Sequence, residues 1–334
     1  MPFADLRGQD RARAHVQRML GSGKLHHGLL FTGPDGVGKL ACARAVAAAL
    51  ACETPRGGDA CGACDACHKA AAELHPDITI LRPAGAGNVI GIGEVRELAA
   101  RLGYPPHEAP ARTVILDGAD RLTIEASNAF LKTLEEPPAR THFILVSAAP
   151  DRLLVTILSR CQRVLFGPLD RAIIAVLLVA QGIPEARARL AAPLAGGSAA
   201  RALALAADGE LERRSGRARG LARAAATRSF KAAVDAAAEL AQAKEEIVPT
   251  LDLLLAWYRD AAALAAGIPA GELAHGDDPA LPAEAASGSI ADLARRAGAV
   301  LDAQTALIAY ANPTLALERM ILAMRPLAPA GAGA

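Results

Sequence analysis

The sequence has 334 residues, which suggests two or three domains, and its 52% content of hydrophobic residues is enough for a sizeable core. The formal net charge is +1, so no overall basic field indicates binding to nucleic acid, and any contact with DNA must come from a local patch or from a partner. No charge-free run of 18 apolar residues occurs and residues 1–5 do not resemble a signal peptide, so we expect no membrane span and a cytoplasmic protein with reduced thiols.

Strand-like and helix-like segments alternate in the first half of the chain. The apolar runs typical of buried strands are residues 28–32, 78–81, 113–116 and 143–146. Helical patterns lie between them at residues 38–50, 92–102 and 125–134. This alternation favours a parallel sheet covered by helices. After about Gly167 the strand signals stop. We expect short helices at residues 168–206 and helices throughout 210–334, apart from a loop at 267–289 and a frayed tail at 326–334, which lies outside the residues described below.

A glycine-rich turn, GPDGVGKL at residues 33–40, follows the first predicted strand and opens a helix. It matches the phosphate-binding pattern G-x-x-x-x-G-K, whose backbone N–H groups surround a phosphate. The residues that would bind nucleotide are Gly33, Gly36, Gly38 and Lys39. The next position needs a hydroxyl to bind Mg²⁺, but Leu40 has no oxygen. Two alternatives stay open: a loop that binds ATP without hydrolysing it, and a loop that is kept only for structure.

The second half of an ATPase site is expected directly after residues 113–116. An ATPase of this type has an acidic pair here, in which the first carboxylate holds the metal ion and the second polarises water. Asp117 occupies the first place, but Gly118 occupies the second and can do no proton chemistry. Together with Leu40, this loss predicts a chain without ATPase activity of its own.

Four of the six cysteines are closely spaced, at Cys52, Cys61, Cys64 and Cys67. The pattern C-x8-C-x2-C-x2-C is typical of tetrahedral zinc, and four sulfurs leave no position for water, so the expected Zn²⁺ is structural. The alternative is disulfides or redox chemistry, which a reducing compartment disfavours.

Several segments are similar to the clamp-loader subunits of bacterial DNA polymerase III, which are AAA+ proteins. They are FADLRGQ at residues 3–9, HGLLFTG at 27–33, the cysteine spacing, NAFLKTLEEPP at 128–138 and TILSRC at 156–161. These motifs occur in the order of the family and cover about residues 3–166. The second half resembles the family only in its helical character and length.

The resemblance implies an α/β fold with a parallel AAA+ P-loop sheet, a zinc-binding insert, a small helical lid and an all-α C-terminal collar. The implied boundaries are 1–167 for the AAA+ domain with its zinc module at 52–67, 168–207 for the lid, and 208–334 for the oligomerising collar. It also implies partners: the γ/τ and δ subunits in a hetero-pentameric ring, the sliding clamp, and primed DNA through the complex. In the family, ATPase subunits keep the Ser or Thr and the Glu, so Leu40 and Gly118 favour the δ′ type, a DNA replication subunit without hydrolysis.

The arginine of the Ser-Arg-Cys segment has a particular role in this family, where it points across a subunit interface into the ATP site of a neighbour. The resemblance therefore implies that Arg160 is an arginine finger, a cation placed against the charge that develops on a γ-phosphate. The alternative is an ordinary surface arginine in a salt bridge.

Two rival functions stay open. An active clamp-loader ATPase of the γ type would require Leu40 and Gly118 to be tolerated, and a zinc-stabilised binding module unrelated to replication would lack the clamp-loader partners. A basic run in the second half favours either contact with DNA or an acidic partner, or a solvated helix face. Its arginines are Arg213, Arg214, Arg217, Arg219, Arg223 and Arg228.

Overall fold

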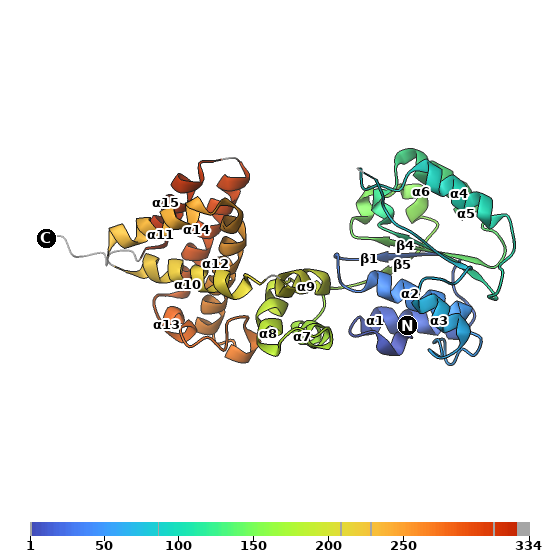
Figure 1. Cartoon of the computed structure of the whole chain (residues 1–334), viewed down its shortest axis with the longest axis horizontal. Coiled ribbons are helices and arrows are strands. Elements are labelled where there is room, and N and C mark those ends of the chain that lie inside the picture. The colour runs from blue at the N-terminus through green and yellow to red at the C-terminus, as the bar shows by residue number, and fades with distance from the viewer. Residues whose placement is uncertain (1, 86, 208, 228, 310, 326–334) are drawn as a thin grey trace. The chain divides into compact units, whose positions relative to one another are not determined.

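The computed structural model describes residues 2–85, 87–207, 209–227, 229–309 and 311–325. The chain forms two compact units (Figure 1). Unit 1 comprises Met1–Leu177 and Gly197–Ala200, and unit 2 comprises Leu178–Gly196 and Arg201–Ala334. The three-domain division expected at residues 167 and 207 stays a prediction. Within the described ranges, no helix combines the length and the apolar character that crossing a bilayer requires.

Unit 1 is built on a five-stranded sheet in which neighbouring strands are parallel and the order is β2-β3-β4-β1-β5. The strands are β1 (Gly28–Thr32), β2 (Ile78–Leu81), β3 (Arg112–Asp117), β4 (Thr141–Ser147) and β5 (Gln162–Leu165). The four predicted apolar runs form β1 to β4, as expected for strands with helices on both faces. Sequence reasoning missed β5. It lies at the edge of the sheet and its Leu165 is 70% exposed, so it lacks a continuous apolar run.

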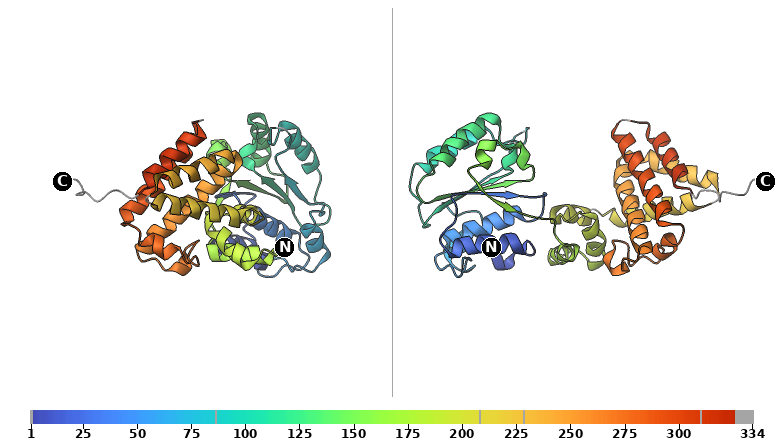
Figure 2. Two further views of the ribbon diagram at one scale, coloured as in Figure 1. Left: turned by 60° about the vertical axis from the view of Figure 1, so that its left-hand side comes forward. Right: turned by 180° about the vertical axis from the view of Figure 1, so that it is seen from behind.

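Helices cover both faces of this sheet. They are α1 (Asp10–Gly21), α2 (Lys39–Ala51), α3 (Asp65–Ala71), α4 (Ile92–Leu102), α5 (Ile124–Glu135) and α6 (Val155–Leu158). Figure 1 shows α1, α2 and α3 on one face and α4, α5 and α6 on the other, and the view from behind in Figure 2 agrees. The core under α4 and α5 includes Leu98, Phe130 and Phe143, and the two phenylalanine rings meet edge to face at 5.4 Å. The predicted parallel sheet with covering helices is confirmed.

The sheet topology decides where the loops meet. Because β3, β4 and β1 are adjacent and parallel, their carboxyl ends open at one edge, which brings Asp117 and Ser147 close to the loop after Thr32. The opposite edge carries the amino ends of the strands, including Gly28 of β1. Arg160 lies at this second edge, directly before β5.

The described residues of unit 2 form helices joined by turns and loops, with no strand among them. Helices α7 (Arg171–Ala180) and α9 (Ala199–Ala207) each begin in unit 1 and continue into unit 2. The other helices of unit 2 are α8 (Glu185–Leu194), α10 (Leu211–Ala226), α11 (Phe230–Gln242), α12 (Lys244–Ala265), α13 (Leu281–Ala285), α14 (Ile290–Ile308) and α15 (Pro313–Met324). The expected loop at 267–289 is wrong in part, because it contains α13 and the 3-10 turn Ala270–Glu272. The side chain of Glu284 holds α13 in place through a buried ion pair with Arg296 at 2.7 Å.

Candidate functional site

The glycine-rich loop joins β1 to α2, as the sequence predicts. Gly33 has φ +150°, and a Cβ atom there would lie 2.1 Å from the carbonyl oxygen of Phe166, so only glycine fits. Gly36 has φ +71°, and its carbonyl oxygen accepts a hydrogen bond of 2.9 Å from the backbone N–H of Ala199. Gly38 is the N-cap of α2. The loop therefore has the backbone of a phosphate loop, but the segment at residues 198–200 is packed against it.

Lys39 does not project into open space. Its side chain is only 5% exposed, and its ammonium group donates hydrogen bonds to the carbonyl oxygens of Gly33 at 2.7 Å and Pro34 at 2.5 Å. Burial lowers the pKa of Lys39, and the carboxylate of Asp35 opposes this shift from 3.9 Å. The ammonium group that would normally contact a phosphate is thus already hydrogen-bonded to carbonyl oxygens of its own loop.

A cavity of about 220 Å³ lies beside Lys39 and is lined by Asp117, Gly118 and Asp120, among others. Burial raises the pKa of Asp117, which stands at the end of β3 as predicted. Asp120 accepts a hydrogen bond of 3.1 Å from the backbone N–H of Ala148 at the end of β4. The structure therefore brings Lys39 and the remaining acids together, but Leu40 and Gly118 supply neither a magnesium ligand nor a base.

The side chain of Gln9 makes hydrogen bonds that sequence reasoning did not predict. Its side-chain amide donates to the carbonyl oxygens of Val37 at 3.2 Å and Gly167 at 2.6 Å, and its Oε1 accepts from the N–H of Gly167 at 3.2 Å. Gln9 has φ +55°, an uncommon conformation for a residue with a side chain. The position of Gln9 at the end of the N-terminal motif FADLRGQ could have marked it as a residue of interest, but the sequence alone does not identify its hydrogen-bond partners. It links that motif to the phosphate loop.

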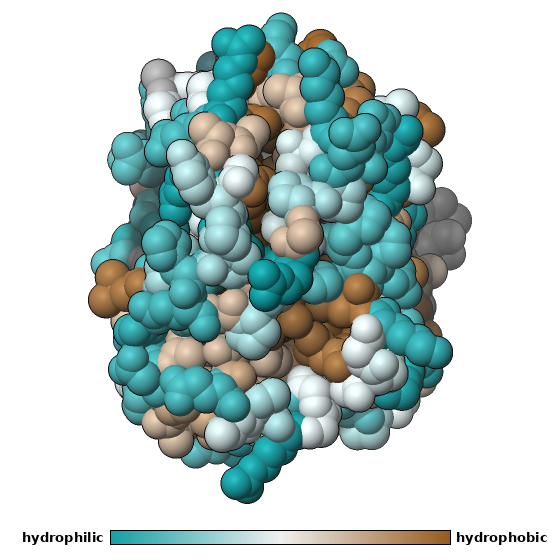
Figure 3. Space-filling view, turned by 90° about the vertical axis from the view of Figure 1, so that its right-hand side faces the viewer, coloured by the Kyte–Doolittle hydropathy of each residue, from teal (hydrophilic) through white to brown (hydrophobic). Residues whose placement is uncertain are grey.

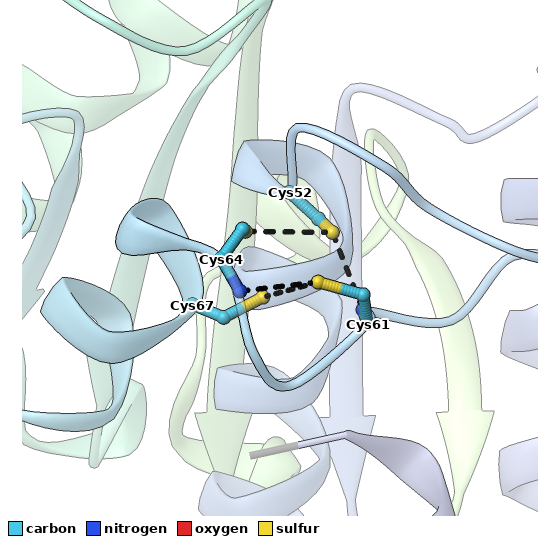
Figure 4. Close-up of side chains that lie close together, drawn as sticks. All are labelled: Cys52, Cys61, Cys64 and Cys67. Carbon is cyan, nitrogen blue, oxygen red and sulfur yellow. Dashed lines mark hydrogen bonds between the residues drawn. The ribbon is translucent and has the colours of Figure 1, made fainter.

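The four predicted cysteines come together between α2 and α3 (Figure 4). All four sulfurs lie within 4.8 Å of one another, and the sulfurs of Cys52 and Cys64, like those of Cys61 and Cys67, are 3.9 Å apart. These cysteines form no disulfides. Tetrahedral zinc with bonds of about 2.3 Å separates its sulfurs by about 3.8 Å, so the cluster fits a metal ion of this kind.

Hydrogen bonds and burial shift the pKa values of two of these thiols in opposite directions. A hydrogen bond from Thr54 and backbone N–H groups of Ala63 and Cys64 lower the pKa of Cys61 to about 5, whereas burial raises the pKa of Cys67 to about 12. A metal ion would replace the remaining protons, because the thiolate is the form that binds metals. Cys42 is buried inside α2 and is not part of the cluster.

Asp59 ties this cluster to the N-terminal segment, which sequence reasoning did not anticipate. Its carboxylate accepts hydrogen bonds from the backbone N–H groups of Phe3 at 2.8 Å, Ala4 at 3.3 Å and Ala60 at 2.7 Å. Phe3 is fully buried. The loop between Cys52 and Cys61 therefore anchors the start of the chain as well as carrying metal ligands.

Arg160 lies apart from the phosphate loop of its own chain. It precedes β5 at the edge where strands begin, whereas the phosphate loop follows the carboxyl end of β1. The five residues of β1 separate these edges by roughly 13 Å, at about 3.3 Å per residue. The guanidinium forms an ion pair of 2.7 Å with Glu135 and is 36% exposed. The predicted site residues therefore form three separate groups: the phosphate loop with Asp117, the cysteine cluster, and Arg160.

The basic run is mostly paired within unit 2. Arg214 makes two hydrogen bonds to Glu246, at 2.7 and 2.8 Å, and Arg213 lies 3.4 Å from the same carboxylate. These contacts lower the pKa of Glu246, first through the hydrogen bond from Arg214. Arg219 pairs with Asp278. Arg228 lies outside the described residues. Much of the run therefore serves contacts between helices.

The family model and the relatives that match the first half of this chain are those of DNA polymerase III subunits. Residues 8–170 match the family described as "DNA polymerase III, delta subunit". DNA polymerase III subunit delta' of Escherichia coli is 38% identical over 185 residues, which are 55% of this chain and 55% of that protein. Subunit tau of the same organism is 36% identical over 168 residues, 50% of this chain and 26% of tau. A DNA polymerase III gamma subunit-related protein of Thermotoga maritima is 19% identical, with a TM-score of 0.38, and the match covers 93% of this chain and 98% of that one. The chain spans about half the length of the delta' relative.

Proposed function

We propose that this chain, which belongs to the clamp-loader family of DNA polymerase III through residues 8–170, acts as a δ′-type subunit that does not hydrolyse ATP. It completes a hetero-pentameric ring with γ/τ and δ subunits in the cytoplasm. The ring opens the sliding clamp and loads it on primed DNA. Its own contribution to ATP hydrolysis is an arginine finger, Arg160, which acts on the nucleotide of a neighbour.

One observation carries this proposal: the chain has a phosphate loop without hydrolytic groups. Leu40 offers no magnesium ligand, Gly118 offers no carboxylate, and Lys39 is engaged by carbonyl groups of its own loop. Because the ammonium group of Lys39 is bonded to these carbonyl oxygens, it would have to leave them to bind a γ-phosphate. Of the two alternatives, we therefore favour a loop that is kept for structure, with Gly33 and Gly36 packed against neighbouring segments.

The position of Arg160 supports action on another subunit. A side chain at the opposite edge of the sheet cannot reach a nucleotide at the phosphate loop of its own chain, because an extended arginine is only about half as long as the roughly 13 Å between the two edges. A planar guanidinium suits phosphate oxygens and is always charged. An arginine at the surface that cannot serve its own site is suited to serve the site of a neighbour.

Two further features fit a subunit of a ring. Four cysteines in tetrahedral arrangement would hold a structural Zn²⁺, with no open position for catalysis. On the face of unit 1 in Figure 3, small apolar patches lie among hydrophilic side chains. Exposed apolar residues of unit 1 include Tyr104, Ile124 and Val155. Single apolar side chains are normal on a protein surface, but a contiguous apolar patch can mark a site where another protein binds, which is compatible with a place in a ring.

The second candidate is an active ATPase of the γ type, and the identity of 36% to tau favours it. ATP turnover by the isolated chain would separate the two candidates.

The proposed function itself is tested by co-expression with γ/τ and δ subunits followed by size-exclusion chromatography. We expect one complex that contains this chain and loads clamps on primed DNA. Failure of the chain to co-elute with the other subunits, or a ring of the same composition and activity without it, would overturn the proposal.

A further inference from the structure

Glu135 ends helix α5 and makes the ion pair with Arg160. Its Oε1 lies 2.7 Å from Nη2 of the guanidinium. The two residues are brought together because α5 packs against α6, and Arg160 follows α6 after one residue. A residue of α5 thus reaches the charged end of an arginine that follows α6.

The other end of the guanidinium is held as well. Nη1 donates hydrogen bonds to the carbonyl oxygen of Thr156 at 3.0 Å and to Oγ of Ser159 at 3.4 Å. Contacts on both terminal nitrogens restrict rotation of a side chain that is otherwise very flexible. A guanidinium has five N–H donors, so these contacts leave donors for a further acceptor.

The location of Glu135 argues against a role in helix stability. A carboxylate at the C-terminus of a helix meets the negative end of the helix dipole, which is unfavourable. The pair also lies at the surface, where the Arg160 side chain is 36% exposed and the Glu135 side chain 48% exposed, so it contributes little to folding. What the pair does provide is a fixed orientation for the guanidinium.

We propose that Glu135 is a positioning residue for Arg160, holding the guanidinium in the orientation in which it meets the γ-phosphate of ATP on a neighbouring subunit. The proposal rests on the trans role of Arg160. Glu135 does not contact the nucleotide. Because its carboxylate already restricts the rotamers of Arg160, less side-chain freedom is lost when the transition state forms. Loss of Glu135 should therefore lower kcat and leave the KM for ATP unchanged.

The experiment uses the reconstituted clamp-loader complex with single substitutions in this chain. In steady-state ATPase assays with clamp and primed DNA, Glu135→Ala should lower the part of kcat that depends on Arg160 by about two- to fivefold, the range expected for an exposed ion pair, with the KM for ATP unchanged. Glu135→Gln should retain more activity than Glu135→Ala, because the amide oxygen still accepts a hydrogen bond. Glu136→Ala removes the adjacent exposed carboxylate and is the matched control.

A double substitution separates positioning from a structural role. Once Arg160 is replaced by Ala, Glu135→Ala should have no further effect on kcat, because the group that it orients is gone. Equal losses from Glu135→Ala with and without Arg160 would overturn the proposal, as would wild-type or raised kcat in Glu135→Ala while Arg160→Ala is impaired. If Arg160→Ala itself has wild-type rates, then the proposed function fails at its trans role, and the positioning role fails with it.

Discussion

The ammonium group of Lys39 donates to the carbonyl oxygen of Gly33 at 2.7 Å, so the cation of the phosphate loop is bound to the first glycine of that same loop. A phosphate would have to displace this contact and a second one with Pro34. The segment at residues 198–200 lies against Gly36, and the backbone N–H of Ala199 donates a hydrogen bond of 2.9 Å to the carbonyl oxygen of that glycine. Lys39, Leu40 and Gly118 are therefore the three positions at which, under the proposed function, this chain departs from a working ATPase site.

We expect the isolated chain to show no ATP turnover above background. We also expect that Leu40→Thr combined with Gly118→Glu does not restore it. Gly118 has φ +81°, and a Cβ atom there would lie 3.1 Å from Cγ of Pro83, so a glutamate would be strained by about 1 kcal/mol or more. The measurement is phosphate release at saturating ATP. Turnover that is abolished by Lys39→Ala would show that the site is active.

The cysteine cluster predicts about one zinc ion per chain in protein purified without added metal, because the spacing of its sulfurs fits tetrahedral zinc. Removal of the metal by a chelator should lower the melting temperature and increase hydrogen exchange at residues 52–67. It should also increase exchange at Phe3 and Ala4, since Asp59 connects them to this segment. Elemental analysis and exchange measurements test this. Less than about 0.2 equivalents of zinc under reducing conditions would contradict it.

Histidines at the amino edge of the sheet predict a loss of stability in acid. Burial lowers the pKa of His27 and of His142, and His26, whose ring lies 4.3 Å from that of His27, adds to the shift of His27. Because the unfolded chain then binds protons more readily than the folded one, the free energy of unfolding should fall as the pH drops below about 6.5.

The variant His27→Phe isolates this contribution while keeping an aromatic ring in place. Denaturant unfolding of zinc-saturated protein between pH 7.5 and 5.5 should show a smaller fall for the variant than for the wild type. An equal fall in both proteins would assign the acid sensitivity to other groups, including the zinc thiolates.

The sequence predicts those features of the structure that depend on residues close together in the chain. Strands β1 to β4 follow from continuous apolar runs, and the cysteine cluster follows from spacing alone. Strand β5 was missed because an edge strand needs no such run. The contacts of Gln9 with Gly167 and of Asp59 with Phe3 join residues far apart in the chain, and single-sequence patterns do not contain such pairings.

The phosphate loop shows a second limit. The absence of a hydroxyl at Leu40 can be read from the sequence, but the engagement of Lys39 by its own loop depends on three-dimensional geometry. The basic run shows the same limit, because the pairing of Arg213 and Arg214 with Glu246 joins two helices. Charge patterns identify candidate residues, and only packing shows which of their charges are already neutralised.

The most direct test of the trans role is the effect of Arg160→Ala on a reconstituted complex with γ/τ and δ subunits. Arginine fingers contribute on the order of 10³–10⁵ in rate at the site they serve, so ATP hydrolysis stimulated by clamp and DNA should fall, and clamp loading should fall further. Arg160→Lys should rescue poorly, because an ammonium group lacks the planar fork. Zinc content, melting temperature and ring assembly should match the wild type. If the fully assembled Arg160→Ala complex hydrolyses ATP and loads clamps at wild-type rates, Arg160 does not act on a neighbouring nucleotide and the proposed trans role is wrong.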